Sequence, residues 1–130
     1  METSAFNQVL PITITGTTPA KGTPIVVSGN DQEDDIEVHQ NDLYVTGNPA
    51  TGQVKTLWIF NATTGAQTAA VGLLVRTTTR LVVLPKANML LVSLASECKV
   101  IRIPLNTRAV DGNFRVPAQI MPRDIARKAD

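Results

Sequence analysis

The sequence predicts an all-β fold, an antiparallel sandwich or jelly-roll-like barrel, and three observations indicate it. Val, Leu and Ile dominate the hydrophobic fraction of 43%, whereas aromatic residues make up only 4%. β-branched residues suit a pleated, half-buried surface. Short apolar runs alternate with Gly, Pro and Asn at spacings of about 8 to 12 residues, which is typical of sandwiches and barrels. No segment shows the pattern of a helix of ordinary length, so alternating βαβ units are not expected.

The expected strands follow from these runs in chain order. The run 9–15 alternates apolar and polar residues and stops at Gly16, and Pro11 near its start fits an edge strand. The run 54–60, which ends at Asn61, has the clearest strand pattern, and 89–94 with 99–103 resembles a hairpin. The full set of expected strands is 9–15, 24–27, 36–38, 43–46, 54–60, 69–75, 81–84, 89–94, 99–103 and a last short one at 114–116.

The two ends of the chain lack this periodicity. We therefore expect an N-terminal arm at 1–8, a β-sandwich domain at 9–103 and a basic C-terminal arm at 104–130. The C-terminal part contains Pro104, Pro117 and Pro122 together with five basic side chains. Such a composition is typical of an arm that becomes ordered on a neighbour rather than of a packed strand.

Alternation along the strands predicts which side chains are buried. If Leu57 and Ile59 point inward, the core also takes Leu81, Val83, Leu91 and Val100 from the neighbouring runs. Trp58 would then point outward. We expect Trp58 and Tyr44 on the surface or at a subunit contact.

A faint internal repeat is visible. Residues 43–45 and 57–61 resemble 90–92 and 100–103, at an offset of roughly 40 to 47 residues that falls in the range of a propeller blade. Two blades cannot close a ring, so a propeller would need several copies of the chain. From the sequence alone, chance similarity between hydrophobic strands is the preferred explanation.

Charge is divided unevenly along the chain. Residues 1–65 carry two basic and seven acidic side chains, and residues 66–130 carry ten basic and four acidic ones. This division suggests head-to-tail packing between copies, with an acidic loop on one copy meeting the basic arm of another. The expected assembly contacts are Asp31, Glu33, Asp34, Asp35, Arg108, Phe114, Arg115, Arg123 and Arg127. Two alternatives stay open: the fold interleaves the two halves, or the acidic run binds a cation.

The residues needed for catalysis or for a metal site are scarce. His39 is the sole histidine, and no serine lies in a Gly-x-Ser-x-Gly setting. A lone Cys98 cannot form a zinc cluster and fits a small buried hydrophobe. We therefore expect no enzyme activity, no cofactor and no metal. Nucleic acid is an unlikely partner, because only Phe114 interrupts the basic C-terminal third. No signal peptide and no membrane span are indicated.

Several segments resemble a known class of proteins. Residues 12–16 and 23–28, followed by 72–74, 81–85 and 89–92, are similar to small all-β bacteriophage virion proteins of the decoration, spike-base and vertex kinds. The resemblance implies a minor capsid, decoration or vertex protein located in the virion, which forms homo-oligomers and binds neighbouring shell subunits. The alternative is a carbohydrate- or protein-binding β module, including an oligomeric propeller-like one, with a cytoplasmic location.

Overall fold

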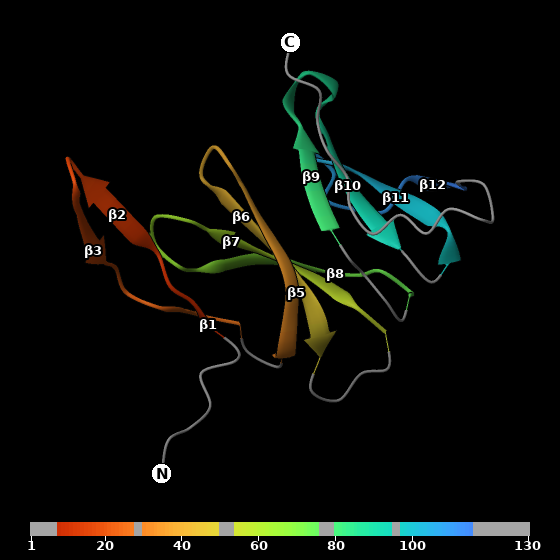
Figure 1. Cartoon of the computed structure of the whole chain (residues 1–130). Coiled ribbons are helices and arrows are strands. Elements are labelled where there is room, and N and C mark those ends of the chain that lie inside the picture. The colour runs from red at the N-terminus through yellow and green to blue at the C-terminus, as the bar shows by residue number, and fades with distance from the viewer. Residues whose placement is uncertain (1–7, 28–29, 50–53, 76–79, 95–96, 116–130) are drawn as a thin grey trace.

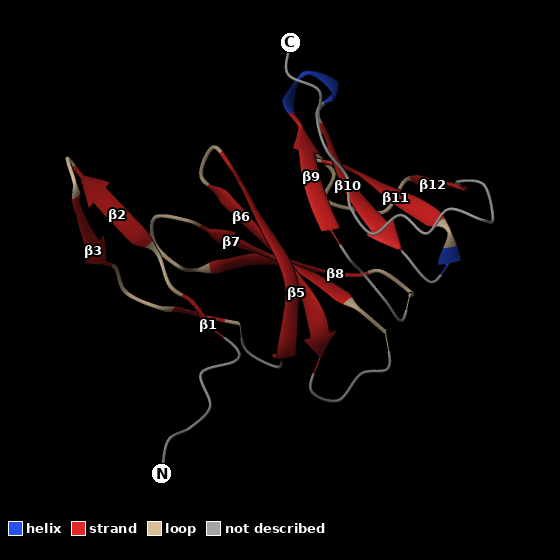
Figure 2. Ribbon diagram, viewed as in Figure 1, coloured by secondary structure: helices blue, strands red, loops and turns tan. Residues whose placement is uncertain are grey.

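The computed structural model describes residues 8–27, 30–49, 54–75, 80–94 and 97–115, and it is built almost entirely of antiparallel strands (Figures 1 and 2). The predicted all-β fold is confirmed. Two four-stranded sheets face each other as an open sandwich, and a small N-terminal segment lies on the far side of one of them (Figure 1).

Each of the two sheets is a simple meander in which every strand pairs with the next one along the chain. The first sheet contains β5 (Asn30–His39), β6 (Asp42–Pro49), β7 (Thr56–Asn61) and β8 (Gln67–Gly72) in that order. The second sheet contains β9 (Arg80–Leu84), β10 (Met89–Leu94), β11 (Lys99–Pro104) and β12 (Gly112–Arg115), also in chain order. The 3₁₀ turn η1 (Pro85–Ala87) joins β9 to β10.

The N-terminal segment, residues 8–27, holds four short strands. Strands β1 (Gln8–Val9) and β4 (Ile25–Val26) pair with each other, and β2 (Ile12–Thr15) pairs with β3 (Thr18–Lys21) in a hairpin that projects from the body (Figure 1). Gly16 has a φ of +63° in the two-residue turn of this hairpin, a conformation that glycine adopts without strain. The expected strand at 9–15 is therefore two strands, separated at Leu10 and Pro11.

Two hydrophobic cores lie on opposite faces of the first sheet. The inter-sheet core joins Tyr44, Leu57 and Ile59 of the first sheet to the inward side chains of β9, β10 and β11. The second core, between the first sheet and the N-terminal segment, contains Ile25, Val27, Leu43, Val45, Trp58 and Phe60. A strand with both faces covered has no polar side, which explains the unbroken apolar run from Leu57 to Phe60.

This arrangement confirms part of the predicted core and corrects the rest. Of the six core residues that we predicted, five are buried: Leu57, Ile59, Leu81, Val83 and Val100. The prediction for Leu91 was wrong, because Leu90 is the side chain that faces the first sheet and Leu91 is only half-buried.

The prediction that Trp58 and Tyr44 lie on the surface was also wrong. Trp58 is only 5% exposed and Tyr44 is buried. Alternation along β7 does direct Trp58 away from Leu57, but the N-terminal segment covers that second face. Tyr44 points into the inter-sheet core, on the same face as its strand partner Ile59.

The two sheets are structural repeats. Leu43 lies opposite Phe60 as Leu90 lies opposite Ile103, and all six partner pairs between β6 and β7 have a counterpart between β10 and β11. The outer strands follow the same scheme: Val38 pairs with Leu43 as Val83 pairs with Leu90. Shared strand order and register go beyond chance similarity between apolar runs, which was our preferred explanation from the sequence.

The expected arms differ from the described structure. Residues 104–115 complete the second sheet, since β11 ends at Pro104 and β12 pairs with β11. Gln8 belongs to β1, and the strands within residues 9–27 belong to two small sheets that are not hydrogen-bonded to either four-stranded sheet. Residues 1–7 and 116–130 lie outside the described part of the chain.

Candidate interaction surface

The acidic run that we expected as a loop lies in the edge strand β5. Asp34 pairs with Lys55, with Nζ 2.8 Å from Oδ2, and the Lys55 side chain is only 7% exposed. A buried ammonium group needs such a carboxylate, because an unpaired charge in this position would be costly. Asp34 is thus engaged inside its own chain.

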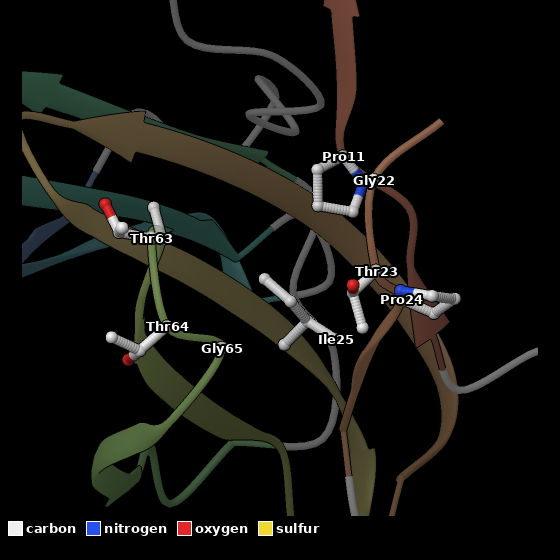
Figure 3. Close-up of a pocket in the computed structure, with 9 residues that line it drawn as sticks. Pro11, Gly22, Thr23, Pro24, Ile25, Thr63, Thr64 and Gly65 are labelled. Carbon is white, nitrogen blue, oxygen red and sulfur yellow. The ribbon is translucent and has the colours of Figure 1, made fainter. Parts of the chain in front are cut away.

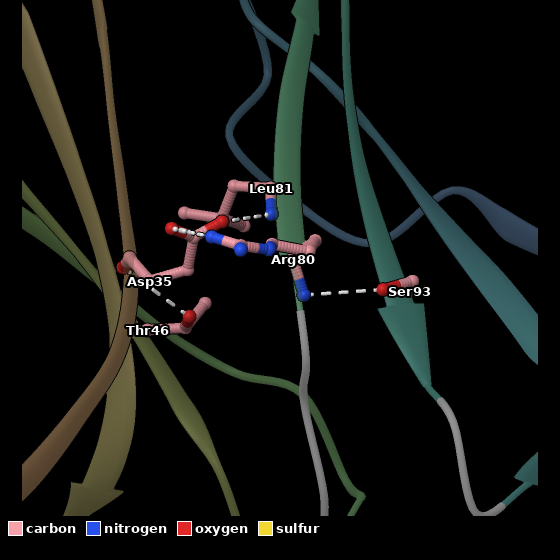
Figure 4. A network of polar contacts seen from close by, with 5 residues as sticks. All are labelled: Asp35, Thr46, Arg80, Leu81 and Ser93. Carbon is pink, nitrogen blue, oxygen red and sulfur yellow. Dashed lines mark hydrogen bonds and ion pairs between the residues drawn. The ribbon is translucent and has the colours of Figure 1, made fainter. Parts of the chain in front are cut away.

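Asp35 connects the two sheets (Figure 4). Its Oδ2 accepts a hydrogen bond of 2.8 Å from the backbone N–H of Leu81, and its Oδ1 lies 3.3 Å from Nη1 of Arg80. The pairing register shifts between Glu33 and Asp35, and a bulge of this kind turns a side chain away from the regular direction of its strand. The carboxylate thereby reaches the first residues of β9.

Hydroxyl groups complete this network. The Oγ1 of Thr46, which lies opposite Asp35, donates to the backbone carbonyl of Asp35 at 3.5 Å. The Oγ of Ser93, which lies opposite Arg80, accepts from the backbone N–H of Arg80 at 3.1 Å. Both hydroxyl side chains are buried. The network therefore fixes how the second repeat starts against the first.

Arg108 also connects the two sheets. Its Nη2 lies 3.0 Å from Oδ2 of Asp42, and its Nη1 donates to Oγ1 of Thr68 at 3.0 Å. Asp42 in turn accepts a hydrogen bond of 3.3 Å from the hydroxyl of Tyr44. Burial, with the negative charge and the hydrogen bond of Asp42, raises the pKa of Tyr44 to about 12, although Arg108 acts in the opposite direction.

Three of the predicted assembly contacts form ion pairs within their own chain. Asp34, Asp35 and Arg108 each pair with a residue outside the predicted set. Phe114 and Arg115 lie on β12 with exposed side chains. Asp31 and Glu33 belong to β5, but their side chains, like the whole of Arg123 and Arg127, lie outside the described structure. Contacts of these residues with another subunit stay a prediction.

A shallow pocket lies where the N-terminal segment meets the turn after β7 (Figure 3). Its volume is about 210 Å³, and its walls include Pro11, Pro24, Ile25 and the turn residues Thr63 and Thr64. The hydroxyl of Thr63 is already used, since it donates to Oδ1 of Asn41 at 2.6 Å. None of the described residues that line the pocket carries a charge. It is small for an organic ligand and is better described as the seam between the segment and the first sheet.

The candidate metal and thiol residues are separated. In the ranges that the structure covers, no three acidic, His or Cys side chains gather as a metal site would require. His39 is half-buried at the end of β5, beside Asp42 on the neighbouring strand. Cys98 is half-buried in a turn with a φ of +50°, so the prediction of a buried hydrophobe at this position was wrong.

Two sheet faces carry apolar side chains that neither core cluster uses. The Phe114 face is the side of the second sheet turned away from the first, with Val82, Leu91, Val100 and Phe114. The Trp58 face is the side of the first sheet that meets the N-terminal segment, and its β5 part ends in Ile36 and Val38, which are 47% and 56% exposed. On the Phe114 face Val82 and Val100 are buried, Leu91 is half-buried and Phe114 is 46% exposed. Of the three exposed side chains on the two faces, Phe114, Ile36 and Val38, our sequence reasoning found only Phe114. Aligning the two repeats residue by residue would have found the others.

No known family matches the chain, and no curated protein resembles it in sequence. None of the helical turns in the described part of the chain has the length or apolar character needed to cross a bilayer. The functional argument therefore rests on the geometry of the two sheets.

Proposed function

We propose that this protein is a non-enzymatic assembly module that binds other proteins through the faces of its repeated sheets. One observation supports the proposal: the face of the first sheet that the second sheet covers is equivalent to the Phe114 face. Tyr44 and Leu57 in the inter-sheet core correspond by register to Leu91 and Val100 on the Phe114 face. The two sheets therefore pack head-to-tail within the chain. The second sheet ends the chain with the Phe114 face, which is equivalent to the face of the first sheet that it covers.

Head-to-tail packing has a known consequence for assembly. Contacts between unlike faces leave one unfilled face at each end of an open array, so further copies add until a ring closes, or a filament forms where it does not. Propellers close a ring with about four to eight four-stranded blades. With two such sheets in each chain, a closed ring would contain roughly two to four copies. This supports the oligomeric, propeller-like alternative among the functions that the sequence suggested.

Protein is a better partner for this module than carbohydrate. Sites for small ligands are usually lined by aromatic side chains at their surface. The sole tryptophan and the sole tyrosine of the chain, Trp58 and Tyr44, are both buried in its cores. The most exposed aromatic side chain among the described residues is Phe114, which lies on a sheet face and not in the pocket.

The resemblance to small bacteriophage virion proteins suggests where such a module would act. A decoration or vertex protein binds the shell subunits beside it, and exposed sheet faces suit that task. We propose the virion as the location on this resemblance, with the cytoplasm as the alternative. The assembly proposal itself does not depend on which of the two holds.

Sedimentation velocity of the full chain, from low to high micromolar concentration, tests the assembly function. We expect the average mass to rise with concentration above that of the monomer. Each chain ends in a face that a second copy can cover, and this packing buries apolar surface. A chain that sediments as a monomer at every concentration would contradict the proposal.

A further inference from the structure

Equivalent apolar positions of β5 and β9 differ strongly in exposure between the two repeats. Ile36 and Val38 correspond by register to Leu81 and Val83. Leu81 and Val83 are 5% and 2% exposed, because the first sheet covers them. Ile36 and Val38 are about half exposed at the same positions of the first sheet. The Trp58 face is therefore only partly covered in a single chain.

The opposite end of the chain shows the same difference. Val71 of β8 lies opposite Leu57 and packs against the inter-sheet core, whereas its counterpart Phe114 lies opposite Val100 and is 46% exposed. Phe114 continues the apolar face that Val100 and Leu91 begin, and a continuous apolar face, rather than a single exposed side chain, marks an interaction site. One repeat thus has an apolar edge on its Trp58 face, and the other has one on its Phe114 face.

We propose that the Phe114 face of one copy docks onto the Trp58 face of a second copy of this chain, in the packing that already joins the two sheets. The inference rests on the proposed assembly function and names its interface. The occupant is a second copy because the Trp58 face has the register and the apolar positions of the sheet face that covers Tyr44 and Leu57 within the chain.

Full docking requires the N-terminal segment to move. Ile25 and Val27 lie over Trp58 and Phe60, in the place that a second copy would take. The segment can detach from the first sheet without breaking strand pairing, since β1 and β4 pair with each other and not with a strand of that sheet. Its hold on the first sheet is the packing of a few apolar side chains. It therefore competes with the second copy for the same face.

Two matched variants test the interface. Phe114→Lys places a charge on one face, and Val38→Lys places the same charge on the other, both at exposed positions where folding should be retained. The control is Leu74→Lys, at a side chain that is 85% exposed and belongs to neither face. All three variants have the same net charge. We expect Phe114→Lys and Val38→Lys to weaken association about tenfold or more, because docking would bury an unpaired ammonium group, and Leu74→Lys to leave it unchanged.

Mixing the two interface variants separates head-to-tail docking from a symmetric contact. The Val38→Lys chain keeps an intact Phe114 face, and the Phe114→Lys chain keeps an intact Trp58 face. An equimolar mixture should form heterodimers at the affinity of the wild-type contact, and growth should stop there. Association that neither variant weakens, or that the mixture fails to restore, would overturn the inference while leaving the assembly function standing. A wild-type chain that stays monomeric would overturn both.

Discussion

Asp35 and Arg80 occupy the same position in the two repeats and contact each other across them. Asp35 lies opposite Thr46 and Arg80 opposite Ser93, and the carboxylate and guanidinium groups are 3.3 Å apart. The same carboxylate accepts the N–H of Leu81. One acidic side chain therefore sets where the second sheet begins against the first.

Removing that carboxylate should loosen the contact between the sheets. We expect Asp35→Ala to lower the free energy of unfolding by about 1–3 kcal/mol, since the N–H of Leu81 loses its acceptor in a partly buried place. The control is Asp111→Ala, which breaks a solvent-exposed pair with Arg102 and should cost less than about 1 kcal/mol. Urea unfolding followed by circular dichroism measures both. Equal losses would mean that Asp35 is an ordinary surface charge.

Neighbouring leucines on β10 offer a direct test of the inter-sheet core. Leu90 is fully buried against the first sheet, and Leu91 is half-buried on the other face. Leu90→Ala should cost about 2–5 kcal/mol of unfolding free energy, whereas Leu91→Ala should cost clearly less. Thermal and urea unfolding of the two variants would decide which leucine faces the core. A larger loss of unfolding free energy for Leu91→Ala would show that the opposite face of the second sheet packs against the first sheet.

Tyr44 should make the stability of the fold depend on alkaline pH. Its pKa is raised to about 12 in the folded chain from its ordinary value of 10.0, so the folded state holds the proton more tightly than the unfolded state. Between these two values the folded state binds more protons, and the free energy of unfolding falls as the pH rises. The effect is absent below pH 10, and above pH 12 the loss is complete.

Ultraviolet absorbance follows this titration directly, because Tyr44 is the sole tyrosine. We expect Asp42→Asn to lower the pKa of Tyr44, since the negative charge that opposes its ionisation is removed. Arg108→Gln should raise it, since a positive charge that favours the phenolate is lost. Identical titration curves for the two variants would show that Asp42 and Arg108 do not act on the hydroxyl.

The N-terminal segment can be tested through Trp58, the sole tryptophan. Ile25→Ser should weaken the local packing of the segment by about 1–3 kcal/mol and make Trp58 emission easier to quench with acrylamide. If the segment competes with a second copy, the same variant should associate more tightly in sedimentation experiments. Unchanged quenching alongside a lower global stability would show that the segment unfolds only with the whole chain.

The fold class and most strands were predictable because each apolar run ends at a turn residue. Strand β5 was the largest error: we expected 36–38, but it spans Asn30–His39. Acidic residues have low strand propensity, so pairing with β6 rather than local preference makes this segment a strand. Trp58 was misplaced for a related reason, since alternation gives the direction of a side chain but not whether that face is covered.

The candidate surface was harder to predict than the fold. The sequence predicted Phe114 as an assembly contact because it is an apolar residue in a basic region. Ile36 and Val38 were predicted only as residues of a strand. Their significance depends on register, which relates them to Leu81 and Val83. Register arises from pairing between distant parts of the chain, and the weak sequence similarity of the two repeats does not fix it.

The meander order of both sheets also shapes how the chain would fold. Because every strand pairs with its neighbour in sequence, each pairing closes only a short loop and costs little chain entropy. Such local topology favours fast folding, and either repeat can provide the nucleus. The docking of one sheet on the other, guided by Asp35, would then be the late step.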